Sequence, residues 1–234
     1  MTTNGKRVAA DGRSTRWDGH KARRRAEVLD AAIAVIDEDG VEVSVGRIAE
    51  RLQLPRPVVY RHFDGRADLD EQIRHRILRS LLTRLMPTLD PNGTIEAAVA
   101  RAVGAYVGWV AEHPNLHRFL SQAAPQSDSA VANARNRIGG RLAELLAAGL
   151  TGFGLDPAPA RPMAFGLVSL ADGVVSSWRS ESGGLSSEQV EAMLTESVLA
   201  LFEGNARRLG LPVARDTIVG DLLTRTGTAA ARAR

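Results

Sequence analysis

Residues 45–63 read VGRIAERL, QLP and RPVVYRHF in succession, and this stretch decides the fold of the N-terminal part of the chain. Its apolar residues are spaced to interlock two short helices at a steep angle across a three-residue turn. The small residue Ala49 stands where the two helices cross, so that their backbones can approach closely. These features are typical of a helix-turn-helix, whose second helix fits the DNA major groove, about 12 Å wide.

Helical periodicity continues on both sides of this stretch. Upstream, apolar residues recur every three or four positions until Gly40, which suits a left-handed C-terminal cap. Ser44 is the expected N-cap of the helix that follows. Downstream, residues 69–85 carry an apolar stripe that predicts a long fourth helix ended by Pro87.

The chain changes character after residues 91–93, where charged residues become rare and a domain boundary is expected. The remainder predicts helices separated by glycine and proline, over residues 94–112, 115–122, 128–150, 160–180 and 186–209. Strand-like alternation is not convincing anywhere. The sequence therefore predicts an all-α protein of about nine helices.

Composition excludes several classes of protein. The chain has 234 residues, of which 44% are apolar and 24% charged, as in ordinary globular proteins. The absence of cysteine excludes disulfides, thiolate metal sites and thiol catalysis. No run of about 18 apolar residues predicts a membrane span, and the first 25 residues lack the apolar segment of a secretory signal. We therefore expect a cytoplasmic protein with no membrane partner.

Positive charge is concentrated at the N-terminus. The formal net charge of the whole chain is +3, whereas residues 1–25 hold eight basic and only two acidic residues. A basic arm on a near-neutral body indicates an anionic partner for the arm. A solubilising flexible tail is the alternative interpretation.

The order and spacing of about a dozen residues resemble the DNA-binding domain of the tetracycline-repressor (TetR) family. The matching positions include Ile48, Ala49, Leu52, Leu54, Val59, Tyr60, His62, Phe63, Arg66 and Leu69. The resemblance covers residues 22 to about 82, and beyond residue 90 it extends only to length, helix count and helical character.

The resemblance implies a sequence of domains. It places a basic flexible arm over residues 1–21 and a three-helix DNA-binding domain over 22–87, with its helix-turn-helix at 45–64. A helical ligand-binding and dimerisation domain is expected over 88–210, and a disordered tail over 211–234.

The resemblance also implies roles for individual residues in DNA binding. Phosphate contacts are expected from Ser44, Tyr60, His62 and Arg66, and base contacts from Arg56, Pro57, Val58 and Arg61. Arg13, Arg16, Arg23 and Arg24 precede the first apolar residues of the domain and are expected to follow the adjacent minor groove. Because arginine pairs in bidentate fashion with guanine, we expect at least one G·C pair in each half-site, read by Arg56 or Arg61.

Two residues depart from the pattern of the family. Gln53 stands in the turn where glycine is common, so a residue with a Cβ must tolerate that backbone. Pro55 replaces the usual capping Ser or Thr, and the lost cap is typically worth about 1 kcal/mol. Pro57 lacks an N–H that needs no partner in the first turn. We expect a rigid but uncapped recognition helix that still binds DNA.

The C-terminal half is expected to hold an effector pocket and a dimer interface. The pocket residues implied are Tyr106, Trp109, Val110, His113, Phe119, Phe165 and Trp178, with a plain hydrophobic core as the alternative. The dimer residues implied are Gly166, Gly173, Ser177, Leu194, Val198 and Leu201, with packing inside one subunit as the alternative. Asp172 is open to three interpretations: a pocket group, a dimer contact or an exposed residue.

Metal ligands and catalytic motifs are not evident. His113 and His117 are four residues apart, but Pro114 between them breaks the helix and no carboxylates accompany them, so neither a metal nor a cofactor is expected. The chain has no nucleophile elbow, phosphate-binding glycine loop or HExxH motif, so we do not expect an enzyme.

The prediction is a ligand-responsive transcriptional regulator. We expect a homodimeric repressor that a small lipophilic effector releases from a palindromic operator in double-stranded DNA. The alternatives are an activator with the same fold or, less favoured, an enzyme or a ligand-binding protein without DNA readout.

Overall fold

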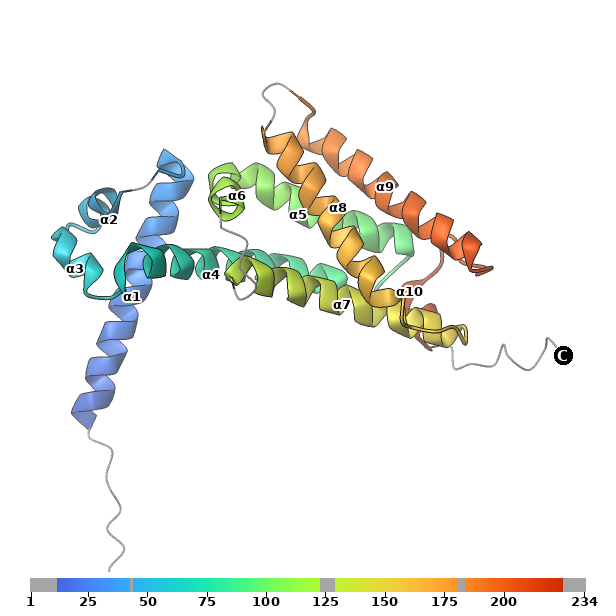
Figure 1. Ribbon diagram of the computed structural model, residues 1–234, viewed down its shortest axis with the longest axis horizontal. Coiled ribbons are helices and arrows are strands. Elements are labelled where there is room, and N and C mark those ends of the chain that lie inside the picture. The colour runs from blue at the N-terminus through green and yellow to red at the C-terminus, as the bar shows by residue number, and fades with distance from the viewer. Residues whose placement is uncertain (1–11, 43, 123–128, 181–183, 225–234) are drawn as a thin grey trace, which may run out of the picture. The chain divides into compact units, whose positions relative to one another are not determined.

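The computed structural model describes residues 12–42, 44–122, 129–180 and 184–224 (Figure 1). Within these residues the fold is all-α, with a single isolated bridge between Thr94 and Ile218 and no strand. The helices are α1 (Gly12–Asp39), α2 (Val45–Arg51), α3 (Arg56–Tyr60), α4 (Gly65–Leu85), a 3-10 helix η1 (Met86–Leu89), α5 (Ile95–Glu112), α6 (Pro114–Ser121), α7 (Ala130–Gly152), α8 (Ala160–Ser180), α9 (Ser187–Arg208) and α10 (Val219–Thr224). The predicted fold class is confirmed.

The chain forms two compact units that divide within α4, after Ile73. The N-terminal unit is built on α1, α2, α3 and the first half of α4. Its core consists of side chains that are almost completely buried, among them Val28, Ile36, Ile48, Val59 and Leu69. The apolar spacing of the sequence therefore faces inward in all four helices.

Local chemistry fixes the ends of α1 and α2 as the sequence predicts. Gly40 adopts a φ of +99°, and its N–H donates to the Ile36 carbonyl at 3.0 Å. A residue with a Cβ would be strained in this left-handed conformation. The Ser44 hydroxyl accepts a hydrogen bond from the Arg47 N–H at 3.2 Å, which caps α2.

The turn before α3 carries both departures from the family pattern. Gln53 has a φ of +54°, so the turn does require the left-handed conformation that glycine adopts at least cost. Pro55 is the N-cap of α3 and supplies no side-chain hydrogen bond, while Pro57 lies in the first turn. The recognition helix is thus uncapped, and Val59 and Phe63 anchor it by burial.

Helix α1 differs from the expectation of a flexible arm over residues 1–21, because it begins at Gly12. Residues 12–27 contain no proline, so the helix that packs at Val28 and Leu29 can continue upstream of its buried part. The expectation therefore does not hold for residues 12–21, whereas residues 1–11 lie outside the described part of the chain.

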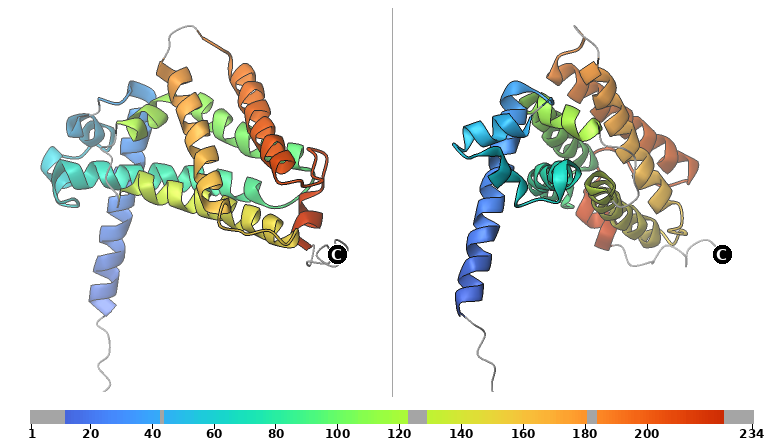
Figure 2. Two further views of the ribbon diagram at one scale, coloured as in Figure 1. Left: turned by 45° about the vertical axis from the view of Figure 1, so that its right-hand side comes forward. Right: turned by 60° about the vertical axis from the view of Figure 1, so that its left-hand side comes forward.

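The C-terminal unit is a bundle in which α7 packs along α8 and α5 packs along α9 (Figure 2). Side-chain caps start three of its helices. Thr94 accepts from the Ala97 N–H at 3.1 Å, Ser129 from the Ala132 N–H at 3.2 Å, and Ser186 forms a capping box with Gln189. The predicted helices of this half occur within two residues of their expected bounds.

The segment after Gly210 also differs from the sequence-based expectation, which was a disordered tail. The Ile95 N–H donates to the Thr217 carbonyl at 3.0 Å, and the Val219 N–H donates to the Gly93 carbonyl at 3.0 Å. Leu222 of α10 is buried against Ile95 and Leu199. Backbone pairing and apolar burial therefore order residues 211–224, which were expected to be disordered; residues 225–234 lie outside the described part.

Candidate nucleic-acid interface and ligand cavity

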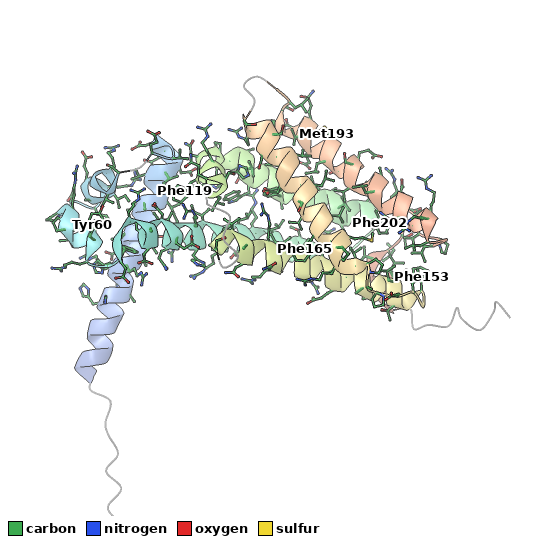
Figure 3. The ribbon with its side chains drawn as sticks, in the orientation of Figure 1. Tyr60, Phe119, Phe153, Phe165, Met193 and Phe202 are labelled. Atoms are coloured by element: carbon green, nitrogen blue, oxygen red, sulfur yellow. The ribbon has the colours of Figure 1, made fainter. Side chains whose placement is uncertain are left out.

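Helix α3 presents its predicted base-reading residues on one face. Arg56, Pro57 and Arg61 are exposed, and Val58 is half-buried. Tyr60, which the resemblance assigns to a phosphate, is 44% exposed and lies on the same short helix (Figure 3). The opposite face is occupied by Val59, which is fully buried. The structure therefore brings these five predicted contacts together.

The arginines of α2 are held by carboxylates at the end of α1. Arg47 donates to Asp39 at 2.6 Å and to Glu50 at 2.9 Å, and Arg51 forms a bidentate pair with Glu38 at 2.5 and 2.9 Å. The Arg51 hydrogen bond holds the pKa of Glu38 below its ordinary value. Both guanidinium groups of α2 are thus already satisfied within the protein.

Arg56 and Arg61 of α3 differ from the α2 arginines in their interactions. The guanidinium groups of both residues make no ion pair or hydrogen bond with the described residues. Their donors can therefore pair with an external acceptor without first giving up an internal one. An exposed arginine with free donors suits bidentate contact with a guanine edge or a phosphate.

Gly46 gives Arg56 its position, a feature that the sequence analysis missed. A Cβ at residue 46 would lie 2.8 Å from both Cζ and Nε of Arg56, which is closer than real side chains approach. The Arg56 guanidinium therefore lies against the bare backbone at the start of α2. A glycine two residues after a helix N-cap, where an ordinary helix former would serve, was the available signal.

His62 is surrounded by positive charge. Burial lowers the pKa of His62, and the charges of Arg61, Lys21, Arg24 and Arg25 lower it further. Its Nδ1 is buried without a hydrogen-bond partner among the described residues. The imidazole is therefore neutral near pH 7 and lies within a cluster of cations, which is an environment suited to a phosphate group.

The remaining predicted phosphate ligands have partners inside the unit. Arg66 donates from Nε to Asp70 at 2.8 and 2.9 Å, and the Ser44 hydroxyl is engaged as the α2 cap. Arg24 pairs with Glu27 at 2.9 Å, whereas Arg23 is exposed. The side chains of Arg13 and Arg16 lie outside the described part, so their predicted role is untested.

The C-terminal unit encloses a cavity of about 880 Å³. Its walls are mainly leucine, valine and alanine side chains from α4, α5, α7, α8, α9 and α10. This volume lies in the range of small-molecule sites, which are typically apolar with a few polar groups. The described walls all belong to residues 78–223, so the cavity lies within one unit.

Polar groups gather around Asp172 in the cavity wall. Asp172 accepts from the Tyr106 hydroxyl at 3.3 Å and forms an ion pair with Arg135. Burial and the negative charge of Asp172 both raise the pKa of Tyr106, so the phenol stays protonated. Burial lowers the pKa of His117, which also lines the cavity, and Asp172 partly offsets that effect. Asp172 therefore lines the cavity, as the first of the three interpretations predicts.

Two of the seven predicted pocket residues, Tyr106 and Trp109, line this cavity, and the other five do not. Val110 is fully buried in the core. His113 separates α5 from α6, with its ring 5.6 Å from that of Trp109. Phe119 lies under Arg74, Phe165 lies under Arg161 and against Gly139, and Trp178 donates to the Leu185 carbonyl at 2.8 Å.

The sequence analysis missed Arg135 and His117 as cavity residues. Arg135 is a charged residue in a helix of mostly small and apolar residues, and its partner Asp172 lies 37 residues further along the chain. Asp172 itself had been singled out, but its partners could not be inferred without the packing of α7 against α8.

The predicted dimer residues fall into two groups. Gly166, Gly173 and Ser177 are exposed along α8, and no atom lies within 4 Å of a Cβ built at either glycine. Leu201 on α9 is 48% exposed. Leu194 is fully buried and Val198 lines the cavity, so both face the interior of their own subunit rather than an outer contact. Met193, which was not among the predicted dimer residues, is also exposed on α9 (Figure 3).

The described residues form neither a metal site nor a membrane span. No group of three or more His, Cys, Asp or Glu side chains in that part of the chain is arranged to hold a metal ion. None of the described helices is both long and apolar enough to cross a membrane.

The steeply crossed α2 and α3, the exposed face of α3 and the surrounding cations define a helix-turn-helix DNA-binding protein. Residues 28–73 match the family model described as bacterial regulatory proteins, tetR family. Residues 28–73 therefore carry a DNA-binding domain of the TetR type, as the sequence predicts.

Relatives extend this likeness over most of the chain. The chain is 26% identical over 196 residues to an uncharacterized HTH-type transcriptional regulator of Mycobacterium tuberculosis, covering 83% of this chain and 84% of the relative. It is 24% identical over 105 residues to the nucleoid occlusion factor SlmA of a Marinomonas species, covering 44% of this chain and 53% of that protein.

Solved structures show the same fold. A tetR-family transcriptional regulator from Streptomyces coelicolor superposes with a TM-score of 0.63 at 22% identity, covering 86% of this chain and 89% of that one. The transcriptional regulator FadR from Bacillus subtilis, solved in complex with stearoyl-CoA, superposes with a TM-score of 0.58 at 20% identity and covers 74% of this chain and 96% of its own.

Proposed function

We propose that the protein is a homodimeric transcriptional repressor that a small lipophilic effector releases from a palindromic operator. The observation that carries this proposal is the continuity of α4. Its first half supplies Leu69 and Ile73 to the core of the DNA-binding unit, and its second half supplies Leu78, Leu81 and Leu85 to the wall of the cavity. Any displacement of α4 by a ligand acts directly on the DNA-binding core.

In this proposal α3 enters the major groove. Arg56 and Arg61 read base edges with their free donors, and Val58 and Pro57 supply apolar contact. Tyr60, His62 and Ser44 contact phosphates, and Arg66 joins them by exchanging its Asp70 partner for a phosphate. Arg23 and Arg24, with Arg13 and Arg16 further upstream, follow the minor groove.

A second copy of the chain supplies the second α3. The exposed small residues of α8 allow a helix of the partner to approach closely, and the exposed Met193 and Leu201 of α9 contribute apolar area. We propose that α8 and α9 pair with their counterparts in an isologous four-helix contact. The two recognition helices would then match half-sites about 34–36 Å apart, one turn of DNA.

The effector occupies the cavity of the C-terminal unit. The mainly aliphatic walls favour a lipophilic ligand, and the Bacillus subtilis relative in its complex with stearoyl-CoA supports that class. The ligand shifts the protein from the DNA-binding state only by as much as it binds the other state more tightly. We propose that the state favoured by the ligand places the two α3 helices too far apart for adjacent major grooves, and that the regulator acts in the bacterial cytoplasm.

Fluorescence anisotropy with a labelled duplex of the intergenic DNA beside the gene tests the DNA half of this proposal. The double variant Tyr60→Ala plus Arg61→Ala should lose specific binding, while Arg137→Ala, an exposed arginine of α7, controls for the loss of one positive charge. Titrations at two salt concentrations separate specific contacts from general attraction to phosphates.

Tight binding that survives competitor DNA and fails only in the double variant supports the proposal. Weak, strongly salt-dependent binding that both variants retain would assign all affinity to the basic N-terminal segment and contradict the role of α3. Transcription from the adjacent promoter in a reconstituted assay then separates repression from activation, because a repressor lowers the transcript level and an activator raises it.

A further inference from the structure

The cavity is elongated. Its lining residues on α7 run from Val131 to Leu150, which corresponds to about 28 Å at 1.5 Å per residue. A sphere with the same volume of about 880 Å³ would be only about 12 Å across. The cavity is therefore a channel along the bundle and suits a long, narrow ligand.

The two ends of this channel differ in chemistry. One end lies between α6, the start of α7 and the second half of α8, and contains Tyr106, Asp172, Arg135 and His117 with three serines, Ser121, Ser129 and Ser176. The other end, beside α10, is lined mainly by apolar side chains such as Phe153, Phe202, Leu211 and Leu222, and it also holds the polar residues Asp90 and Asn205. Phe153 and Phe202 lie at the end of the bundle opposite to Phe119 of α6 (Figure 3).

The charges at the polar end already neutralise one another. Asp172 accepts a hydrogen bond from Tyr106 and forms an ion pair with Arg135. The negative charge of the carboxylate is therefore already balanced by the guanidinium. An anionic head group would have to compete with Asp172 for Arg135, and a cationic one would have to compete with Arg135 for Asp172. A charged group held at His117, which is only 6% exposed, would also lose its hydration, and this loss is costly unless a full partner is supplied.

The imidazole of His117 makes no hydrogen bond with the described residues, although the residue is only 6% exposed. The backbone of His117 is paired, because its N–H donates to the His113 carbonyl and its carbonyl accepts from the Ser121 hydroxyl. A neutral imidazole offers one N–H donor and one nitrogen acceptor. It therefore matches a hydroxyl, which can donate and accept, or a carbonyl, which accepts.

We propose that the effector is a single-chain lipophile with an uncharged oxygen-bearing head, a hydroxyl or carbonyl, that hydrogen-bonds His117 while its chain extends toward α10. This assignment rests on the proposed function, because it takes the cavity to be the effector site. The proposal restricts the effector to long single-chain molecules and excludes those whose head group is charged.

Displacement of the fluorescent probe N-phenyl-1-naphthylamine from the full-length protein provides the test. The competitors are 1-dodecanol, 1-chlorododecane, dodecanoate and dodecylammonium, with 1-hexanol as the short control. 1-Dodecanol should displace the probe at a concentration at least about tenfold lower than the other three dodecyl compounds. 1-Hexanol should be weaker than 1-dodecanol by more than about a hundredfold, because six methylenes are no longer buried.

Variants of His117 isolate the head-group contact. His117→Phe should raise the half-displacing concentration of 1-dodecanol about tenfold and leave that of 1-chlorododecane unchanged, while His117→Gln should restore most of the loss. If His117→Phe fails to fold, as judged by circular dichroism, the comparison of 1-dodecanol with 1-chlorododecane on the wild-type protein still decides the question.

Failure of this inference is distinguishable from failure of the cavity as a binding site. Ala102→Trp fills the channel from α5 and should abolish probe binding, whereas Ala111→Trp on the exposed face of the same helix should not. If Ala102→Trp binds the probe as well as the wild type does, or if the wild type does not bind it, the cavity is not the binding site. Probe binding that dodecanoate, dodecylammonium or 1-chlorododecane displaces as well as 1-dodecanol would overturn only the uncharged head.

Discussion

Helices α2 and α3 lie next to each other in one helix-turn-helix, yet their arginines are in opposite states. Arg47 and Arg51 of α2 are paired with carboxylates, two of which stand at the end of α1, whereas Arg56 and Arg61 at either end of α3 have no such partner in the part of the chain that the structure describes. Composition alone would count all four as equal candidates for DNA contact. The comparison teaches that neighbouring carboxylates, and not the number of arginines, decide which guanidinium groups are free to bind DNA.

The largest expected effect is that of Arg61→Ala. Its free guanidinium is expected to contact a base edge, so operator affinity should fall about 10- to 100-fold and discrimination at one half-site position should be lost. Anisotropy titrations against a panel of single base changes measure both. Arg51→Ala is the matched control on α2 and should change affinity by less than about threefold. Equal losses in the two variants would contradict the distinction between the helices.

A smaller effect is expected from Gly46→Ala. The added Cβ displaces the Arg56 guanidinium from its place against α2, so operator affinity should fall about three- to tenfold. Stability should be unchanged or rise by up to about 1 kcal/mol, because alanine is the better helix former. Urea denaturation and the same titrations check both predictions. Gly140→Ala, at an open position of α7, controls for the helix-forming effect and should not alter DNA binding.

The smallest effect is expected from Glu38→Gln, which releases Arg51 from its bidentate pair. The freed guanidinium becomes available to phosphates, so the salt dependence of DNA binding should steepen by up to about one unit of log–log slope. Stability should fall by less than about 1 kcal/mol, because exposed ion pairs contribute little. Glu144→Gln on α7 removes one negative charge without touching the DNA-binding unit. A slope that changes equally in both variants would show a net-charge effect rather than the release of Arg51.

Local features of the fold could be predicted from the sequence because each depends on a few adjacent residues. The Ser44 cap, the left-handed Gly40 and the positive φ at Gln53 follow from residue type and position in a short pattern. The face of α3 followed in the same way, since burial of Val59 and Phe63 fixes which side remains exposed.

Features that depend on packing could not be predicted in this way. Helix α9 has apolar residues on more than one face, so the pattern could not decide that Leu194 points inward while Met193 and Leu201 point outward. The Arg135–Asp172 pair joins two helices, and the order of residues 211–224 depends on pairing with residues 93–96. In each case the deciding partner lies far away in the sequence.

The pairing of residues 211–224 with the start of α5 has a consequence for the order in which the protein is made. Leu211, Val213, Val219, Leu222 and Leu223 are walls of the channel, and they leave the ribosome after every other described wall. The DNA-binding unit relies on contacts among residues made much earlier, and domains generally fold as units from the N-terminus. A premature stop codon just after Gly210 would therefore yield a chain with an intact DNA-binding unit and a channel open at its apolar end. In a cell that also carries the normal gene, we expect the truncated protein to keep the target promoter repressed when the effector is present. The allele would therefore be dominant.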